Sequence, residues 1–328
     1  MIISLVTIGS LLYTWAAFPS LTNTTKDSVY FFVRTGSQYP QVYMDFKKSG
    51  ILKYERGFDW VAKKKEYNAN IKPGRYLLLK GMSNSQIVDV LRSGKQAEVK
   101  LVFNTTRYFD RLAGVVSKQI EADSSSIIAA LRDTAMIKKY GFTTDHWRAM
   151  FIPNTYRFLW NTSAEQFLDR MNLEFKAFWN KDRENRLKEI GLDKFQLMSL
   201  AAIVQEETIK PEDMPKVAGV YMNRLKMGIK LQADPTVIYA LGDYSIKRVL
   251  RKHLLFDSPY NTYVYPGLPP GPIRIPSLQA IEASLNYQKH DYLYFCAKED
   301  FSGFSVFAKT YNEHLINARK YQKALDKN

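Results

Sequence analysis

The stretch that decides the fold is residues 197–228, which read LMSLAAIVQEETIKPEDMPKVAGVYMNRLKMG. It opens with an almost unbroken apolar run, and a helix of that composition is typically buried on most sides. Gln205, Glu206 and Glu207 follow in succession, and Pro211 predicts the end of the helix. Carboxylates at the end of such a helix need an explanation, because an unpaired ionised Glu is costly to bury.

The helical phase of these carboxylates distinguishes them. Glu207 lies seven, four and three residues after Leu200, Ile203 and Val204, so it continues their apolar stripe, whereas Glu206 is off that stripe. Both lie in the last turn, where the helix dipole disfavours a further negative charge. Burial and dipole both raise a carboxyl pKa, which suits a general acid working near neutral pH. The structural alternative is an apolar helix with a polar end.

Length and charge limit the classes of protein that this chain can be. Its 328 residues have room for two or three domains, and a hydrophobic content of 46% permits a large core. The net charge is +15, with 47 Lys and Arg against 32 Asp and Glu, which suits an acidic polymer or an anionic membrane. The basic residues form short scattered clusters without a nucleic-acid motif, so we expect no nucleic-acid partner.

Metal and cofactor chemistry has no clear signal. Cys296 is the single cysteine and cannot form an internal disulfide. The four histidines are not spaced as metal ligands: His146, His253, His290 and His314. We therefore expect neither a metal nor another cofactor.

The N-terminal residues 1–18 contain no charged side chain. As a helix they would span about 27 Å, close to the thickness of a hydrocarbon core. We interpret them as a single transmembrane anchor followed by a polar tether, residues 19–27. A cleaved signal peptide is the alternative, although no basic region precedes the apolar run.

Residues 28–104 are predicted to form a small α+β module. Short strands are expected at residues 28–33, 75–79 and 98–103, and short helices at 39–48, 58–65 and 86–92. This pattern carries no catalytic chemistry. It fits a glycan-binding module of LysM type or a structural spacer.

Residues 105–328 are predicted to form a larger, mainly helical α+β domain. Helices are expected at residues 108–119 and 127–133, a long one at 165–189, and a further one at 235–241 with Asp234 as its N-cap. Residues 292–297 and 305–308 indicate a hairpin, and Thr310 is expected to start the closing helix. Asp234, directly before Pro235, is as typical of a helix cap as of a binding residue.

A Pro- and Gly-rich loop at residues 258–273 carries Tyr260, Asn261, Thr262 and Tyr263. Such a run cannot form regular structure. Aromatic rings stack on the C–H faces of sugars and amides pair with hydroxyls, so the loop suits a sugar site. A purely structural loop is the alternative.

Several ordered motifs together carry a family resemblance: AIVQEET (202–208), VYMNRL (220–225), LQADPTVIY (231–239), YNTY (260–263) and GLPPGPI (267–273). The chain resembles the endolytic murein transglycosylases of the YceG-like family. That family usually has Glu-x-Glu at the helix end, and its second Glu is catalytic. Here Gln205 occupies the first position and Glu207 the second, so the resemblance implies that Glu207 is the catalytic residue. The substrate-binding residues that it implies are Asn223, Gln232, Asp234, Thr236, Tyr260, Asn261, Thr262 and Tyr263.

The resemblance also implies a reaction. The substrate would be the peptidoglycan glycan strand, cut between N-acetylmuramic acid and N-acetylglucosamine to leave a 1,6-anhydromuramyl end. One Glu would act first as acid and then as base, because the muramyl C6 hydroxyl replaces water. The implied setting is the bacterial inner membrane, with the catalytic domain on the periplasmic face, trimming or terminating nascent strands beside peptidoglycan synthases. The alternatives are a muramidase-type hydrolase and a non-catalytic, membrane-anchored peptidoglycan-binding scaffold.

Overall fold

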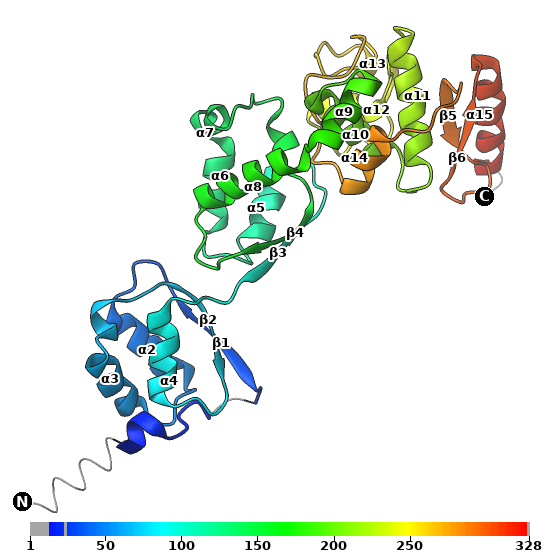
Figure 1. Ribbon diagram of the computed structural model, residues 1–328. Coiled ribbons are helices and arrows are strands. Elements are labelled where there is room, and N and C mark those ends of the chain that lie inside the picture. The colour runs from blue at the N-terminus through cyan, green and yellow to red at the C-terminus, as the bar shows by residue number, and fades with distance from the viewer. Residues whose placement is uncertain (1–12, 23–24, 327–328) are drawn as a thin grey trace, which may run out of the picture. The chain divides into compact units, whose positions relative to one another are not determined.

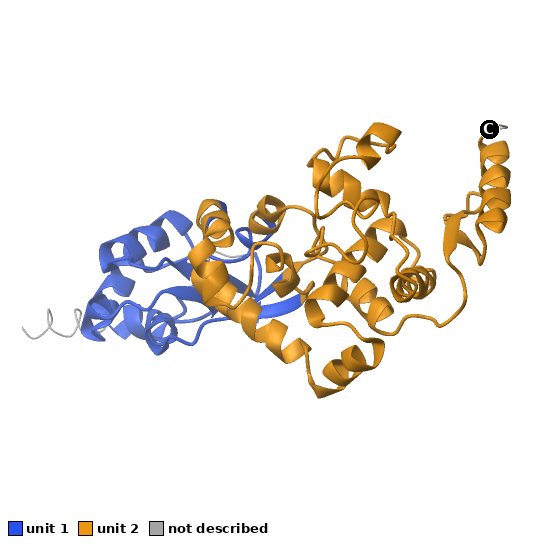
Figure 2. Ribbon diagram, turned by 90° about the horizontal axis from the view of Figure 1, so that it is seen from above, with its two compact units in different colours: residues 1–101, 115–124, 155–164 blue, residues 102–114, 125–154, 165–328 orange. Residues whose placement is uncertain are grey.

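The computed structural model of the protein describes residues 13–22 and 25–326 (Figure 1). The chain divides into two compact units, shown in Figure 2. Unit 1 comprises residues 1–101, 115–124 and 155–164, and unit 2 comprises residues 102–114, 125–154 and 165–328. Both combine helices with short strands, which confirms a mixed α+β fold.

Unit 1 is built around an antiparallel pair of strands. Its elements are β1 (Ser28–Val33), α2 (Tyr39–Ser49), α3 (Glu55–Lys64), β2 (Gly74–Leu79) and α4 (Asn84–Ser93), with a 3-10 turn at Tyr67–Ala69. The inward-facing residues of the strands, such as Phe31, pack with Phe46 and Phe58 in one core. The predicted strands at 28–33 and 75–79 and the three predicted helices are present.

The segment before β1 joins this core. Leu21 is completely buried and pairs with Leu52, and Ser20 is also buried, although both lie within the predicted tether, residues 19–27. Most of the predicted anchor, residues 1–18, lies outside the described residues. Within the described part of the chain, no helix is both long enough and apolar enough to cross a membrane.

Short helices make up most of unit 2. Between α4 and α10 the chain contains β3 (Val99–Phe103), α5 (Phe109–Val116), α6 (Ser124–Arg132), α7 (Thr134–Lys139), a 3-10 turn (Trp147–Met150), β4 (Asn154–Phe158), α8 (Ala164–Phe178) and α9 (Lys181–Ile190). Residues 99–101 of β3 and 155–158 of β4 belong to unit 1. The single long helix predicted at residues 165–189 is wrong: α8 and α9 are separate. The break lies at Asn180, whose side chain accepts a hydrogen bond from the Arg183 N–H and so begins a new helix.

The predicted buried helix is α10 (Lys194–Glu207), which the other helices surround. Asp193 and Gln196 form a capping box at its start, and every residue from Leu197 to Val204 is buried. The helices packed against it are α9, α11 (Met214–Lys226), α12 (Asp234–Leu241) and α14 (Leu278–Leu285), and a short α13 (Arg251–Leu254) follows α12. Glu207 is the last residue of α10, so the packing of this buried helix fixes the position of the Glu207 carboxylate.

The C-terminal part of unit 2 is an antiparallel hairpin, β5 (Tyr294–Ala297) and β6 (Ser305–Ala308), followed by α15 (Tyr311–Leu325). The predicted hairpin is confirmed, as is Thr310, which caps α15. The segment leading into β5 crosses α11 at Gly219. A β-carbon there would lie 2.3 Å from the carbonyl oxygen of Gln288, so only glycine permits this close approach.

Candidate functional site

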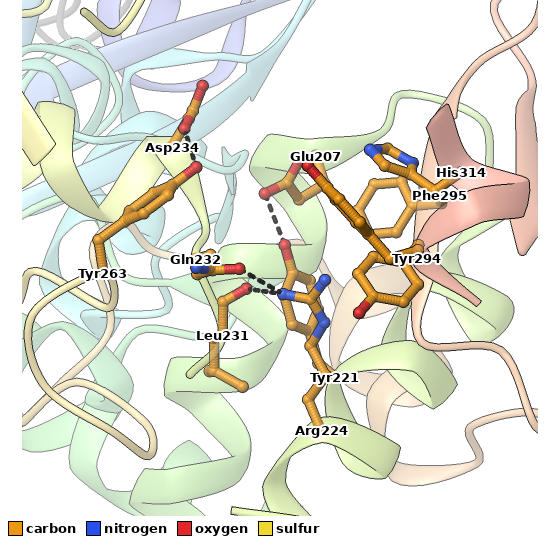
Figure 3. Close-up of a pocket in the computed structure, with 11 residues that line it drawn as sticks. Glu207, Tyr221, Arg224, Leu231, Gln232, Asp234, Tyr263, Tyr294, Phe295 and His314 are labelled. Atoms are coloured by element: carbon orange, nitrogen blue, oxygen red, sulfur yellow. Dashed lines mark hydrogen bonds between the residues drawn. The ribbon is translucent and has the colours of Figure 1, made fainter. Parts of the chain in front are cut away.

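An open pocket of about 380 Å³ lies at the C-terminal end of α10 (Figure 3). Its walls come from α10, α11, the segment before α12, the Pro- and Gly-rich loop, β5 and α15. The lining residues are Glu207, Tyr221, Arg224, Leu231, Gln232, Asp234, Tyr263, Tyr294, Phe295, Tyr311 and His314. Aromatic rings and polar groups therefore meet around the residue predicted to be catalytic.

Glu207 is held from α11. The Tyr221 hydroxyl donates a 2.7 Å hydrogen bond to Glu207 Oε1, and Tyr221 itself is buried. The pKa of Glu207 is raised to about 7, mainly by burial; the Tyr221 hydrogen bond and the Arg224 charge oppose the rise, and the charges of Asp234 and Glu206 add to it. At neutral pH this carboxyl is therefore divided between its acid and base forms, and such a group can donate or accept a proton.

Arg224 places a fixed positive charge in the pocket. It is 8% exposed, and its Nε and Nη1 donate to the carbonyl oxygens of Leu293 and Leu231 at 2.7 and 2.8 Å. The guanidinium also lies 5.0 Å from the centre of the Tyr294 ring. Because carbonyl groups rather than a carboxylate hold it within the described part of the chain, its charge is available to act on Glu207.

Three of the predicted substrate-binding residues line the pocket with Glu207. The Tyr263 hydroxyl donates a 2.6 Å hydrogen bond to Asp234 Oδ1, which orients both side chains. Gln232 has a φ of +52°, a left-handed conformation that is uncommon for a residue with a side chain. Its N–H donates to the carbonyl oxygen of Thr262 at 3.1 Å, so the loop fixes Gln232 at the pocket wall.

The structure places Thr236, Asn261 and Thr262 elsewhere, in the buried support of the loop. The hydroxyls of Thr236 and Thr262 lie 2.9 Å apart, and Thr262 Oγ1 accepts a hydrogen bond from the Ala233 N–H. Asn261 Nδ2 donates to the carbonyl oxygen of Phe256 at 2.7 Å. These side chains are absent from the pocket lining, and their polar groups hold the backbone around Gln232 and Tyr263.

Asn223 and Tyr260 also lie outside the pocket lining. Asn223 Nδ2 donates to the carbonyl oxygens of His290 and Tyr292 at 2.7 and 3.0 Å, and so ties the segment before β5 to α11. The Tyr260 hydroxyl donates to Asp145 at 2.9 Å. Asn223 therefore positions the wall that carries Tyr294.

Sequence reasoning did not assign seven of the lining residues: Tyr221, Arg224, Leu231, Tyr294, Phe295, Tyr311 and His314. Tyr221 and Arg224 are three residues apart and so share one face of α11, a signal that was available in the sequence. Tyr294 and His314 stack, with ring centres 5.5 Å apart, but they come from the hairpin and α15. Their approach to Glu207 depends on tertiary packing that no local pattern encodes.

The neighbouring residues of α10 have different surroundings. Glu206 is held by two guanidiniums: Arg107 Nε and Arg274 Nη1 donate to its Oε1 at 2.6 and 2.8 Å, and Arg107 Nη2 donates to its Oε2. Gln205 Oε1 accepts a 3.3 Å hydrogen bond from the N–H of Ser277, the cap of α14. Gln205 therefore has a structural hydrogen bond, and Glu207 alone of the three lines the pocket.

Comparisons with known proteins show what this chain is similar to. The model of the YceG-like family matches residues 31–320. An endolytic murein transglycosylase of Bacillus subtilis is 30% identical over 95% of this chain and 90% of its own length. One of Streptococcus pneumoniae is 28% identical over 87% of this chain, which spans 57% of that protein. The crystal structure of a YceG-like protein of Listeria monocytogenes matches with a TM-score of 0.56 and 28% identity, over 89% of this chain and 99% of that one.

Proposed function

The chain belongs to the YceG-like family, and from this premise we propose that it is a lytic transglycosylase that cuts peptidoglycan glycan strands internally. The relatives that carry the name endolytic murein transglycosylase are lyases of this kind. The single observation that supports the proposal most is Glu207, a carboxyl with a pKa raised to about 7 in a pocket of aromatic and polar groups.

The proposed reaction uses this carboxyl twice. Protonated Glu207 gives its proton to the glycosidic oxygen as the bond from the muramyl C1 breaks, and positive charge develops on the sugar ring. The resulting carboxylate then takes the proton of the muramyl C6 hydroxyl, whose oxygen closes on C1. The products are a free N-acetylglucosamine hydroxyl and a 1,6-anhydromuramyl end, and Glu207 is again protonated.

Tyr221 and Asp234 have distinct parts in this proposal. Tyr221 is a positioning residue, since its hydrogen bond occupies Oε1 of Glu207 and leaves Oε2 for the transferred proton. Asp234 keeps a negative charge in the pocket, which favours the protonated form of Glu207 before bond cleavage. The same charge can stabilise the positive sugar that follows.

Asp234 also supports one alternative, a muramidase-type hydrolase. Glycoside hydrolases use two carboxylates, the second as a nucleophile or as the base that activates water. Asp234 is a second carboxylate in the same pocket as Glu207, although its Oδ1 already accepts the Tyr263 hydrogen bond. In this alternative the product has a reducing muramyl end.

Mass spectrometry of the products separates these reactions. The full chain is incubated with purified glycan strands, with the Glu207→Gln protein as the control. Transglycosylation yields muramyl ends that are lighter by one water than the reducing ends of hydrolysis. Reducing ends as the main product would replace the proposal by the hydrolase. Binding without cleavage by the unmodified protein would instead favour a non-catalytic scaffold.

We further propose a membrane setting for the reaction. The charge-free residues 1–18 would hold the protein in the inner membrane, with the catalytic domain on the periplasmic side, where it trims or terminates nascent strands beside peptidoglycan synthases. Residues 28–104 would act as a LysM-like module. Release of the full-length protein from membranes by alkaline carbonate would contradict the anchor.

A further inference from the structure

A second pocket, of about 220 Å³, lies on the other side of the end of α10. Its lining residues are Arg107, Glu206, Pro235, Ile238, Tyr239, Tyr244, Ile246 and Ile273. The two pockets are neighbours, because consecutive residues divide between them: Glu207 and Asp234 line the first pocket, and Glu206 and Pro235 line the second. We call this second cavity the guanidinium pocket.

Positive charge exceeds negative charge around the guanidinium pocket. Arg107 and Arg274 both bind Glu206, and Arg148 donates a 2.9 Å hydrogen bond to the hydroxyl of the lining residue Tyr239. Among the described residues, Glu206 is the only carboxylate that any of these three arginines contacts. Burial lowers the pKa of Arg274; the charge of Glu206 opposes this effect, and the nearby positive charge of Arg107 adds to it.

Arg107 is the guanidinium best placed to meet a ligand. Its side chain is 40% exposed, whereas that of Arg274 is 14% exposed. Its hydrogen bonds to Glu206 use Nε and Nη2, and within the described residues Nη1 has no recorded acceptor. The guanidinium also lies 5.4 Å from the centre of the Tyr244 ring, which limits its motion. Arg107 therefore has both an available donor and a fixed orientation.

The remaining walls indicate what kind of anion fits. Pro235, Ile238, Ile246 and Ile273 are apolar, so the pocket suits aliphatic groups better than sugar hydroxyls. A short peptide with small apolar side chains and a carboxylate has this combination. In peptidoglycan such a peptide, the stem, hangs from the lactyl group of each muramic acid, next to the bond that Glu207 would cut.

We propose that the guanidinium pocket binds the peptide stem of the substrate through its carboxylate, with Arg107 as the contact residue. This inference rests on the proposed function, since it assigns the glycan to the pocket of Glu207. Binding of the stem beside that pocket would select strands that still carry peptides and would set the register of cleavage.

The experiment compares two glycan strands, one that carries its stems and one from which an amidase has removed them. Binding to both is measured with the full-chain Glu207→Gln protein, which cannot turn them over. We expect the stem-bearing strand to bind about tenfold more tightly, the size of effect that a hydrogen bond between charged groups can supply. In the Glu207→Gln background, Arg107→Gln should bring the ratio of the two dissociation constants close to one.

Two further variants keep the result interpretable. Arg183 binds Glu282 through Nε and Nη2, as Arg107 binds Glu206, but lies outside both pockets; Arg183→Gln should keep the preference. Ile246→Glu adds a carboxylate at the guanidinium pocket without breaking an ion pair, and it should also abolish the preference by repulsion. Equal binding of both strands by the Glu207→Gln protein would overturn this inference and leave the proposed function standing. An unchanged preference in Arg107→Gln and Ile246→Glu would do the same. Failure to bind either strand would overturn the proposed function with it.

Discussion

Glu206 and Glu207 are adjacent in the sequence, yet the two sides of α10 on which they lie are chemically opposite. Glu206 is 7% exposed and is neutralised by Arg107 and Arg274, so its role is to hold elements together. Glu207 has no cationic hydrogen-bond partner among the described residues; it accepts from a neutral phenol, and its pKa rises to about 7. The comparison teaches that the partners on neighbouring elements, and not the residue type, decide whether a carboxylate is structural or reactive.

The largest expected effect is on the rate of cleavage, which should depend on Glu207 far more than on Glu206. Glu207→Gln should lower the rate of strand cleavage by about 10³-fold or more, because an amide cannot deliver a proton and one group serves both steps. Glu206→Gln should retain most of the activity of the folded protein. The measurement is the initial rate of anhydromuropeptide release at equal concentrations of folded protein. Equal losses in both variants would contradict the distinction between the two sides.

The second effect is on stability, which should depend on the charge of Glu206. Glu206→Gln leaves two guanidiniums close together without a counter-charge, and should lower the free energy of unfolding by about 2–3 kcal/mol. This is less than for a fully buried pair, because the Arg107 side chain is 40% exposed. Urea titration at pH 7 measures it.

Glu282→Gln is the matched control for this stability effect, since it removes a carboxylate that binds the single guanidinium of Arg183 and is 37% exposed. It should lower the free energy of unfolding by about 1 kcal/mol at most. If Glu282→Gln lost as much stability as Glu206→Gln, the second arginine beside Glu206 would not account for the loss.

Much of unit 2 could be predicted because its signals are local. The apolar run before Gln205 identified α10, Thr310 identified the start of α15, and the segments 292–297 and 305–308 identified the hairpin. The break at Asn180 was missed, because the apolar spacing continues on both sides and a cap residue competes only weakly with that pattern.

The candidate site was predictable only in part for the same reason. The helical stripe of Glu207 was visible, and so were the motifs that carry Gln232, Asp234 and Tyr263. The motif residues Asn261 and Thr262 turned out to satisfy buried backbone groups, a demand that follows from the path of the loop in three dimensions. The opposite wall, with Tyr294 and His314, depends on the crossing at Gly219 and could not be read from spacing.

The third effect concerns the stability of the Glu207 side as pH changes. A folded-state pKa of about 7 against an ordinary value of 4.5 means that the folded protein binds a proton more readily than the unfolded chain. This contribution is fully present below pH 4.5 and is lost as pH rises through 7. Glu207→Gln should therefore be about 1–2 kcal/mol more stable than the unmodified protein at pH 8, and this gain should shrink towards pH 5.

Unfolding midpoints of the two proteins, measured from pH 5 to 8, check the expected gain. Glu189→Gln is the control, since that side chain is 63% exposed and pairs with Arg186 on the surface. A gain that does not change with pH would show that the carboxyl titrates alike in the folded and unfolded states.

The smallest effect is on the pKa of Glu207, which substitutions of Tyr221 and Asp234 should shift in opposite directions. The Tyr221 hydrogen bond lowers the pKa of Glu207 and the Asp234 charge raises it. A general acid must be protonated, so kcat/KM should fall above the pKa of Glu207 in the free enzyme. Tyr221→Phe should move this alkaline limb to higher pH, and Asp234→Asn should move it to lower pH, each by about one unit or less.

The direction of the shift is the informative result, because either substitution can also lower kcat. The Tyr265 hydroxyl donates to Asp257 at 2.7 Å, and Tyr265 does not line the pocket. Tyr265→Phe therefore removes a comparable hydrogen bond without touching Glu207, and should leave the limb in place. Opposite shifts from Tyr221→Phe and Asp234→Asn cannot arise from a general loss of folding, which would lower activity at every pH. A shift of both variants in one direction would mean that a different group controls the limb, and the contrast between the two sides of α10 would then not rest on Glu207.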